Sequence, residues 1–320
     1  MSRNKRPPTE LFEAAIEGDR SALARLLSLI ERGDADARTI GRLAYPLSGS
    51  GYTVGLTGAP GAGKSTLTSS IIGHLRKMDL EIAVLAIDPS SPFTGGAILG
   101  DRVRMQDHAT DPGVFIRSMA TRGHLGGLSL ATPEAVRLLH AIGRDWILVE
   151  TVGVGQVEVE VAGKADTTIV VVNPGWGDSV QANKAGLMEV ADVFVINKSD
   201  RKGVEETRRD LMQMLDLSDL SDESWRPPIV STVGLTGEGV PDLWDAVLAH
   251  REYAESSGEL LERRTFRLRE ELREIVAQRL GQRARKICSG ERWDELTDSV
   301  VAHKIDPWTA ADEMLQVVDA

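Results

Sequence analysis

The feature that most constrains the fold of this chain is a series of short apolar runs, rich in β-branched residues, that alternate with longer stretches of helical pattern. Runs that are apolar throughout indicate strands buried on both faces, and parallel strands need crossover connections of helical length. The sequence therefore predicts an α/β domain in which helices cover both faces of a mostly parallel sheet. The expected strands are at residues 52–58, 81–88, 113–119, 145–151, 167–175, 190–200 and 227–233.

A helical pattern without strands precedes this region. Residues 9–32 are predicted to form a helix whose apolar positions are Leu23, Leu26, Leu27 and Ile30. A second helical piece leads towards Pro46, and the glycine- and serine-rich residues 48–51 mark a boundary. We therefore expect an N-terminal helical segment at residues 1–47 and a main domain at residues 48–255.

The remaining residues, 256–320, are predicted to form a C-terminal helical extension. Its first long helix is highly charged and carries an apolar stripe made of Leu268, Leu272, Ile275, Val276 and Leu280. An apolar stripe on a helix needs a surface to pack against, either the main domain or a second copy of the chain. The sequence leaves both readings open, and the dimerisation arm is the interpretation that we carry forward.

Composition and charge exclude several classes of partner. With 42% hydrophobic and 27% charged residues among 320, the composition is that of an ordinary globular protein. The net charge of -11 disfavours binding to nucleic acid or to anionic membranes, which attract basic surfaces. No apolar run has the length of a membrane span, the N-terminus lacks the apolar core of a signal peptide, and a single cysteine, Cys288, excludes an internal disulfide. These features predict a cytoplasmic protein.

The segment GLTGAPGAGKST follows the first predicted strand and has the GxxxxGK[ST] spacing of a phosphate-binding P-loop. Glycines let successive backbone N–H groups turn inward around phosphate oxygens, and the helix that starts near Lys64 adds its positive end. Lys64 would reach the β- and γ-phosphates, and the Ser65 hydroxyl would bind Mg²⁺. The predicted nucleotide-binding residues of this loop are Gly58, Ala59, Pro60, Gly61, Ala62, Gly63, Lys64, Ser65 and Thr66.

A second polar motif, NKSD, ends the sixth predicted strand and indicates which nucleotide is bound. The Asp200 carboxylate can accept hydrogen bonds from N1–H and the 2-amino group of guanine, and adenine offers neither donor. Lys198 can lie along the base, while Asn197 braces the phosphate loop and contacts N7. The segment after the last strand is placed to close on the base through the backbone groups of Ser231, Thr232 and Val233. The sequence predicts GTP and GDP as the bound nucleotides.

Hydrolysis of GTP requires a metal ion, a positioned water and stabilisation of charge at the γ-phosphate. Besides Ser65, three acidic residues could hold Mg²⁺ or its waters: Asp88, Asp101 and Glu150. Glu150 ends a buried strand, and a glycine-rich turn follows in which Gly153 could donate its backbone N–H to the γ-phosphate. We therefore expect the three acids and Lys64 to be catalytic, and the turn after Glu150 to be the flexible part of a GTPase switch.

Together, these segments resemble the MeaB/ArgK-like GTPases, a family associated with methylmalonyl-CoA mutase. The resemblance covers roughly residues 45–255 and rests on GAPGAGKST, IDPSSPFTGGAILGDRVRM, ETVGVGQVEVEVA, GDSVQANKAGLMEVADVFVINKSD and STVGLTGEG. The combination of Asp-Pro-Ser-Ser with Glu-Thr-Val-Gly is more specific than either GTPase motif alone. The segments NPGWGDSVQANKAG and FIRSMATRGHLGGLS depart from the family pattern, which leaves open which mutase is served.

The resemblance implies a P-loop G domain of the class that includes signal-recognition and metallochaperone GTPases, usually as a homodimer. Members of the family protect and load adenosylcobalamin-dependent acyl-CoA mutases, and they couple GTP hydrolysis to delivery of the cofactor and exchange of damaged cofactor. Residues 174–186 resemble an additional switch of the family, in which Lys184 is a candidate catalytic group that moves in when the mutase binds. From the residues alone, Lys184 is equally well read as a solvated helix lysine.

Two other functions fit parts of the sequence. A nickel-delivery metallochaperone GTPase would carry clustered histidine or cysteine ligands, whereas the six histidines are scattered and Cys288 stands alone. A small-molecule P-loop kinase would need an acceptor pocket, and the guanine motif is unusual for metabolic kinases. A binding module with an inactive nucleotide site is disfavoured because Lys64, Ser65 and the three acids are all present. The expected function is a Mg²⁺-dependent GTPase that serves an acyl-CoA mutase as a chaperone.

Overall fold

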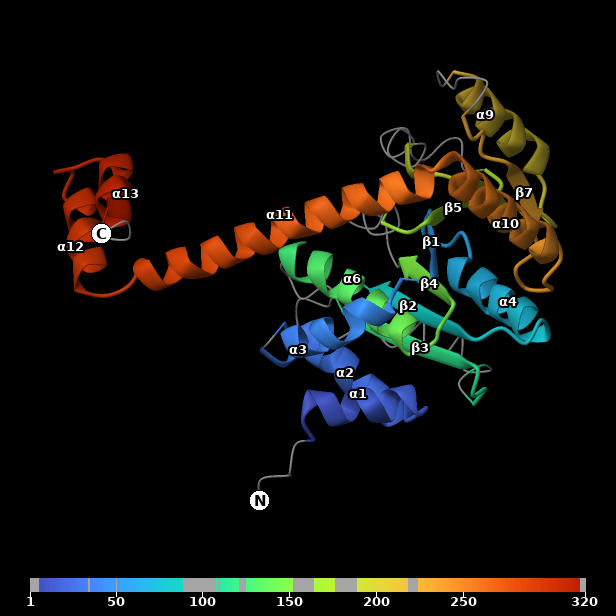
Figure 1. Cartoon of the computed structure of the whole chain (residues 1–320). Coiled ribbons are helices and arrows are strands. Elements are labelled where there is room, and N and C mark those ends of the chain that lie inside the picture. The colour runs from blue at the N-terminus through green and yellow to red at the C-terminus, as the bar shows by residue number, and fades with distance from the viewer. Residues whose placement is uncertain are drawn as a thin grey trace. The chain divides into compact units, whose positions relative to one another are not determined.

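The computed structural model in Figure 1 describes residues 6–33, 35–49, 51–88, 108, 110–120, 125–151, 164–175, 189–217 and 224–316. At Asp88, Ala120, residues 125–130 and Gln316 it describes the backbone alone. Contacts divide the chain into two units, residues 1–267 and residues 268–320. The first unit contains the sheet, with helices on either side of it.

Seven strands of the described residues form one sheet in the order β3-β2-β4-β1-β5-β6-β7. Every neighbouring pair is parallel, and β1 lies at the centre between β4 and β5. This confirms the predicted fold class of a P-loop α/β protein. The strands are β1 (Tyr52–Gly58), β2 (Ile82–Asp88), β3 (Val114–Ala120), β4 (Trp146–Thr151), β5 (Thr167–Val172), β6 (Val193–Asn197) and β7 (Ile229–Thr232).

Two of these strands end three residues earlier than the sequence pattern predicts. β5 ends at Val172 rather than near residue 175. Pro174 has no N–H to donate to a neighbouring strand, and Gly175 turns the chain with a φ of +85°. β6 ends at Asn197 because Lys198 has a φ of +59°, which no strand residue adopts. Both ends leave polar groups at the carboxyl edge of the sheet.

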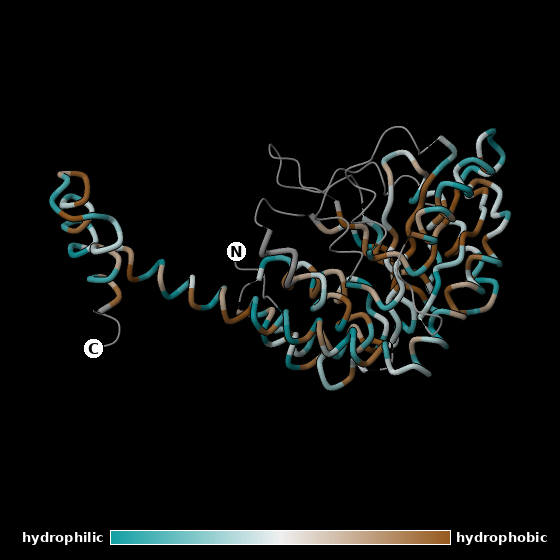
Figure 2. The backbone as a smooth tube through the Cα atoms, turned by 90° about the horizontal axis from the view of Figure 1, so that it is seen from above, coloured by the Kyte–Doolittle hydropathy of each residue, from teal (hydrophilic) through white to brown (hydrophobic). Residues whose placement is uncertain are grey.

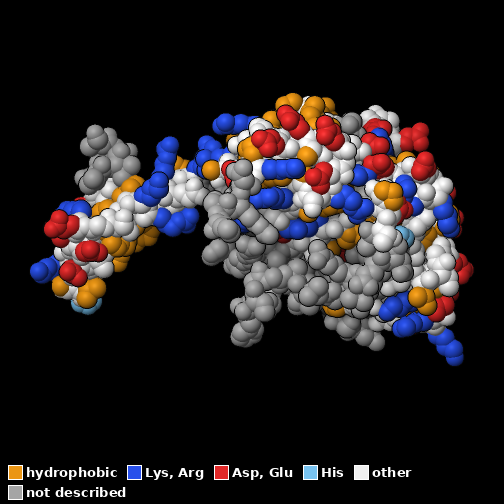
Figure 3. Space-filling view, turned by 90° about the horizontal axis from the view of Figure 1, so that it is seen from below, with side chains coloured by type: hydrophobic (Ala, Val, Ile, Leu, Met, Phe, Trp, Pro, Cys, Tyr) orange, Lys and Arg blue, Asp and Glu red, His pale blue; other side chains and the backbone are white. Residues whose placement is uncertain are grey.

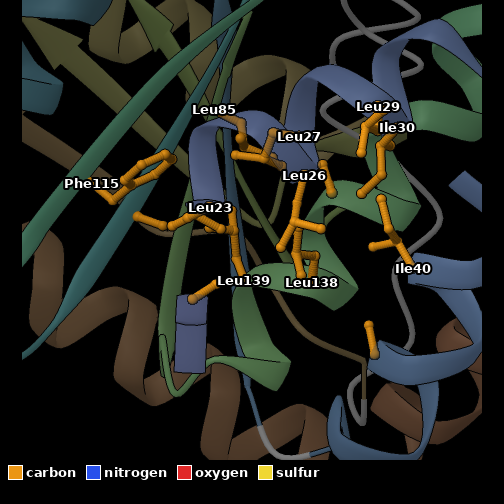
Figure 4. Close-up of a cluster of buried hydrophobic side chains, with 14 of the residues drawn as sticks. Leu23, Leu26, Leu27, Leu29, Ile30, Ile40, Leu85, Phe115, Leu138 and Leu139 are labelled. Carbon is orange, nitrogen blue, oxygen red and sulfur yellow. The ribbon is translucent and has the colours of Figure 1, made fainter. Parts of the chain in front are cut away.

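Helices cover the two faces of the sheet through alternate strand residues. Ile169 and Val171 of β5 belong to the cluster with α4 (Lys64–Lys77) and α10 (Val240–Ser257). Val170 and Val172 face the other way and pack with α9 (Val204–Asp216). Near β2 and β4 the second face is covered by α2 (Arg20–Arg32), α3 (Ala35–Ala44) and α6 (Leu125–Ala141). Figure 4 shows this cluster, including Leu26 and Leu27 of α2 and Leu138 of α6.

The N-terminal helical pattern is divided into two helices, where the sequence predicted one over residues 9–32. α1 spans Pro8–Ile16 and α2 spans Arg20–Arg32. Gly18 has a φ of +97°, which breaks the helix, and the carboxylate of Asp19 then caps α2 by accepting from the N–H of Ser21 and of Ala22. α3 follows, and a short 3₁₀ turn, Tyr45–Leu47, leads towards β1.

A buried aspartate stands immediately before β5 at the amino end of the sheet. Asp166 accepts from Nε of Arg264 at 3.0 Å and from its Nη2 at 2.7 Å, and it also pairs with Arg267. The backbone N–H of Thr53 donates to the same carboxylate at 3.1 Å. Both arginines lie in the first turns of α11 (Glu259–Ile287), so Asp166 ties the start of that helix to the sheet.

A second buried aspartate, Asp192, stands immediately before β6. Its carboxylate accepts from the N–H of Thr168 at 2.7 Å and from Nη1 of Arg263 at 2.9 Å. Nε2 of the fully buried His250 lies 3.2 Å from the same carboxylate. Hence the arginine cluster of α11 (Arg263, Arg264 and Arg267) pairs with two buried carboxylates, one before β5 and one before the adjacent β6.

The second unit contains most of α11 together with α12 (Glu291–Val301) and α13 (Pro307–Gln316). Among its described residues the buried apolar side chains are few, namely Leu296, Ala310 and Met314. The predicted stripe of α11 is largely solvent-exposed within one chain, with 62% exposure at Leu272 and 57% at Leu280. Apolar and polar residues alternate along α11 in Figure 2, and Figure 3 shows hydrophobic side chains exposed on these helices.

α11 has 29 residues, enough in length to cross a membrane, but charged residues occur throughout it. No helix in the described part of the chain combines the length and the apolar character of a membrane span.

Candidate nucleotide site

The predicted phosphate loop connects β1 to α4 at the carboxyl end of the sheet. Two of its glycines have backbone conformations and neighbours that exclude a side chain. Gly58 has a φ of +134°, and a Cβ there would lie 2.0 Å from the carbonyl oxygen of Val171. Gly63 has a φ of +91°, and a Cβ there would lie 2.6 Å from Nδ2 of Asn197. α4 begins at Lys64, so its first-turn N–H groups and positive end are placed at the loop.

Lys64, Ser65 and Glu150 form the buried centre of this site. Nζ of Lys64 donates to the carbonyl oxygens of Gly58 at 2.8 Å and Ala59 at 3.1 Å, so its charge lies inside the loop. Oγ of Ser65 donates to Oε1 of Glu150 at 2.6 Å, and the Glu150 side chain is fully buried. Hydroxyl and carboxylate oxygens are the donors that Mg²⁺ prefers, so this pair is chemically suited to a magnesium ion beside bound phosphate.

Strand order explains how Glu150 reaches Ser65, from which it is separated by 85 residues in the sequence. β4 lies beside β1, and Glu150 is in register with Leu56, two residues before the phosphate loop begins. β2 is the other neighbour of β4, and its last residue is Asp88. The backbone of Asp88 therefore lies at the same edge of the sheet as that of Glu150.

Three other predicted site residues, Asp101, Gly153 and Lys184, lie outside the described residues. Among the side chains that the structure describes, no group of three histidines, cysteines, aspartates or glutamates is arranged to hold a metal ion. The described side chains thus bring together Ser65 and Glu150, while the roles predicted for Asp88 and Asp101 stay predictions.

Asn197 joins the phosphate loop to the segment that follows β7. Its Nδ2 donates to the carbonyl oxygen of Ala62 at 2.8 Å, and to that of Gly63 at 3.4 Å. Its Oδ1 accepts from Oγ1 of Thr232 at 3.1 Å and from the N–H of Gly234 at 2.9 Å. Because the amide is buried and bonded on both sides, it fixes the distance between the two segments.

The chain turns sharply after Asn197, and the other two residues of the NKSD motif lie in that turn. Lys198 has the positive φ noted above, uncommon for a residue with a side chain, and its Nζ donates to the carbonyl oxygen of Gly61 at 2.5 Å. The N–H of Ser199 donates to the carbonyl oxygen of Thr232 at 3.0 Å. Asp200 is exposed, so its carboxylate is accessible at the rim of the site.

The last predicted segment, Ser231 to Val233, lies at the end of β7, and a loop (Val233–Gly239) follows it. An antiparallel bridge between Val233 and Glu238 closes this loop. Arg208 of α9 holds β7 in place, because Nη2 donates to Oγ of Ser231 at 2.8 Å and Nη1 donates to the carbonyl oxygen of Ile229 at 3.0 Å.

Three residues that support the site were missed from the sequence: Ser70, Arg208 and Gly234. Ser70 and Arg208 lie within helices that carry other serines or arginines, so no spacing distinguishes them. Gly234 stands inside the segment STVGLTGEG, but its contacts with Asn197 and Ser70 depend on how three distant segments meet.

The parallel sheet, the loop between β1 and α4, and the polar residues at the carboxyl edge define a P-loop GTPase. Residues 23–289 match the family described as methylmalonyl Co-A mutase-associated GTPase MeaB. The chain belongs to this family, which confirms the resemblance found in the sequence.

Individual relatives are similar over most of the chain. It is 50% identical to a putative GTPase of Pyrococcus horikoshii, over 98% of each protein. It is 38% identical to GTPase ArgK of Escherichia coli, over 80% of each. The mitochondrial methylmalonic aciduria type A homolog of Mus musculus is 35% identical, over 79% of this chain and 65% of that protein. The crystal structure of a protein described as LAO/AO transport system kinase matches over 100% of both chains with a TM-score of 0.72 and 27% identity.

Proposed function

We propose that this GTPase is a chaperone that assists an adenosylcobalamin-dependent acyl-CoA mutase, of the methylmalonyl-CoA mutase type, in loading, protecting and reactivating its cofactor. The observation that carries the proposal is membership of a family named for its association with methylmalonyl Co-A mutase, with a match that includes both the phosphate loop and the NKSD motif. The name of the mouse relative, methylmalonic aciduria type A homolog, supports the same area of metabolism.

The nucleotide would bind at the carboxyl end of the sheet. The phosphate loop would surround the β- and γ-phosphates with N–H groups, and the buried Lys64 would neutralise part of their charge. Asp200 would accept from the guanine base, and Asn197 would keep the base-binding residues at a set distance from the phosphate loop. Ser65 and Glu150 would hold Mg²⁺, which supplies charge stabilisation at the phosphates when it is bound.

The remaining roles fall on the side chain of Asp88, where only the backbone is described, and on Asp101, Gly153 and Lys184, which lie outside the described part of the chain. Asp88 and Asp101 would complete the Mg²⁺ and water network, and Gly153 would donate its N–H to the γ-phosphate. Lys184 would move in when the mutase binds. A partner that orders these segments would accelerate hydrolysis, because switch residues stabilise the charge that develops at the γ-phosphate only when they are ordered.

The protein would act as a homodimer in the cytoplasm. The apolar stripe of α11, including Leu272 and Leu280, is exposed in one chain, and packing against a second copy of the chain would bury it. Charge supports this pairing, since the end of α11 is basic and α12 and α13 are acidic. The basic residues are Arg279, Arg283, Arg285 and Lys286, and the acidic residues include Glu291, Asp294, Glu295, Asp298, Asp312 and Glu313.

The proposal is tested by GTP turnover of the purified full chain, with and without an adenosylcobalamin-dependent acyl-CoA mutase from the same cell. We expect slow turnover alone and an acceleration of about tenfold or more with the mutase, equivalent to about 1.4 kcal/mol of barrier. ATP should give no stimulated turnover, and a Lys64→Ala variant controls for contaminating activity. Turnover that no such mutase changes would leave the GTPase in place and overturn the chaperone role, and metal-delivery clients would be tested next.

A further inference from the structure

The hydroxyl of Ser70 is directed away from its own helix. Serine and threonine inside a helix commonly donate to the carbonyl oxygen four residues earlier, as Thr68 does to Lys64 at 3.0 Å. Ser70 lies two residues further along α4, and its Oγ donates instead to the carbonyl oxygen of Gly234 at 2.6 Å. The contact joins residues 164 positions apart, from the helix of the phosphate loop to the loop Val233–Gly239.

Gly234 is held from two directions. Its carbonyl accepts from Ser70, and its N–H donates to Oδ1 of Asn197 at 2.9 Å. The approach is close, because a Cβ at Gly234 would lie 3.2 Å from Oδ1 of Asn197 and 3.2 Å from the backbone nitrogen of Leu67. One residue of the loop thus contacts both α4 and the end of β6.

We propose that Ser70 is a positioning residue for recognition of the guanine base. This inference deepens the GTP binding proposed above and rests on it. Through Gly234, Ser70 sets where the loop Val233–Gly239 lies relative to Asn197 and Asp200. The phosphate loop does not depend on this contact, since Lys64 and Asn197 hold it through separate hydrogen bonds. Loss of the Ser70 hydroxyl therefore weakens binding of the base and leaves binding of the phosphates unchanged.

The test is equilibrium binding of GDP, ADP and inorganic pyrophosphate to the full chain, each in competition with a fluorescent GDP analogue. For Ser70→Ala we expect GDP affinity to fall about 3- to 10-fold, the usual effect of one lost hydrogen bond. Affinity for ADP and pyrophosphate should stay at the wild-type values, so the preference for GDP over ADP narrows by the same factor. Ser70→Thr keeps the hydroxyl and should restore the preference.

Ser69→Ala is the matched control. It removes the neighbouring hydroxyl on the same helix, which contacts Nε2 of His108 at 3.1 Å and not the loop, so GDP binding should be unchanged.

Two results overturn the inference. In the first, Ser70→Ala binds GDP as the wild type does. In the second, all three ligands weaken together, which would show a general structural role. Failure of the underlying GTP proposal looks different, because the wild-type chain itself would then show no preference for GDP over ADP.

Discussion

At the carboxyl end of the sheet, the phosphate loop is held by side chains that bind backbone groups, whereas at the amino end buried carboxylates bind guanidinium groups. Lys64 and Asn197 donate to carbonyl oxygens of the phosphate loop. Asp166 and Asp192 are instead matched by arginines of α11 and by backbone N–H groups. A backbone carbonyl can exchange its partner at little cost, but a buried charge cannot lose its counter-charge. We infer that the carboxyl end is built for ligands and the amino end for stability.

The largest effect is expected from Asp166→Ala at the amino end. The substitution leaves Arg264 and Arg267 without their carboxylate and removes the acceptor of the Thr53 N–H, so the free energy of unfolding should fall by about 3–5 kcal/mol. Urea denaturation measures it. The control is Asp216→Ala, which removes the exposed partner of Arg226 and should cost about 1 kcal/mol or less. Equal effects of the two substitutions would contradict the stabilising role of the buried Asp166 carboxylate.

Burial of a titratable side chain also makes stability depend on pH at His140, which lies against Gly51 just before β1. Burial lowers the pKa of His140 from 6.5 to about 4, and the charges of Asp166, Arg264 and Asp145 modify this shift. Between these two pKa values the unfolded chain binds a proton that the folded chain does not. The free energy of unfolding should therefore decrease by up to about 3 kcal/mol as the pH falls from 6.5 to 4.

His140→Gln removes this titration and should flatten the dependence of the free energy of unfolding on pH between 6.5 and 4. An unchanged slope in that range would contradict the assignment to His140.

Asp166 affects stability in a different pH range. Its burial opposes ionisation, but hydrogen bonds and charges from Arg264 and Arg267 outweigh burial and hold its pKa below the usual 3.8. The stability it adds is present at neutral pH and is lost as the pH falls below about 4.

The smallest effect is expected from Thr232→Val at the carboxyl end. The change keeps the shape of the side chain but removes the hydroxyl that donates to Asn197, which retains the N–H of Gly234. GDP affinity should fall about fivefold, which corresponds to about 1 kcal/mol. The free energy of unfolding, measured by urea denaturation, should change by about 1 kcal/mol or less. If Thr232→Val lost stability and kept its GDP affinity, Thr232 would serve stability rather than ligand binding, contrary to the role inferred for the carboxyl end.

The pattern of apolar runs predicted the sheet because each buried strand carries its own local signal, and β1, from Tyr52 to Gly58, matches the predicted bounds. The GKST turn likewise predicted that α4 begins near Lys64. The break between α1 and α2 was missed because the apolar spacing resumes after Gly18 and Asp19, although glycine followed by aspartate is a common signal for one helix ending and another starting.

The arginine cluster could not be predicted in this way. Arg263 lies 71 residues from Asp192, and Arg264 lies 98 residues from Asp166. Charged residues are frequent in α11, so nothing in its sequence marks these three arginines as partners of buried acids. Only the strand order, which puts β5 beside β6, brings both aspartates to the start of one helix.

β6 has a consequence for how this chain can vary in length. Asp192 precedes the strand and Asn197 ends it, so the amide that braces the nucleotide loop stands five positions after the carboxylate that anchors α11. The strand is hydrogen-bonded on both sides, to β5 and to β7. Inserting or deleting one residue would turn every side chain beyond that point to the opposite face of the sheet. The chain can accept insertions in its surface loops, but this stretch has a single permitted length.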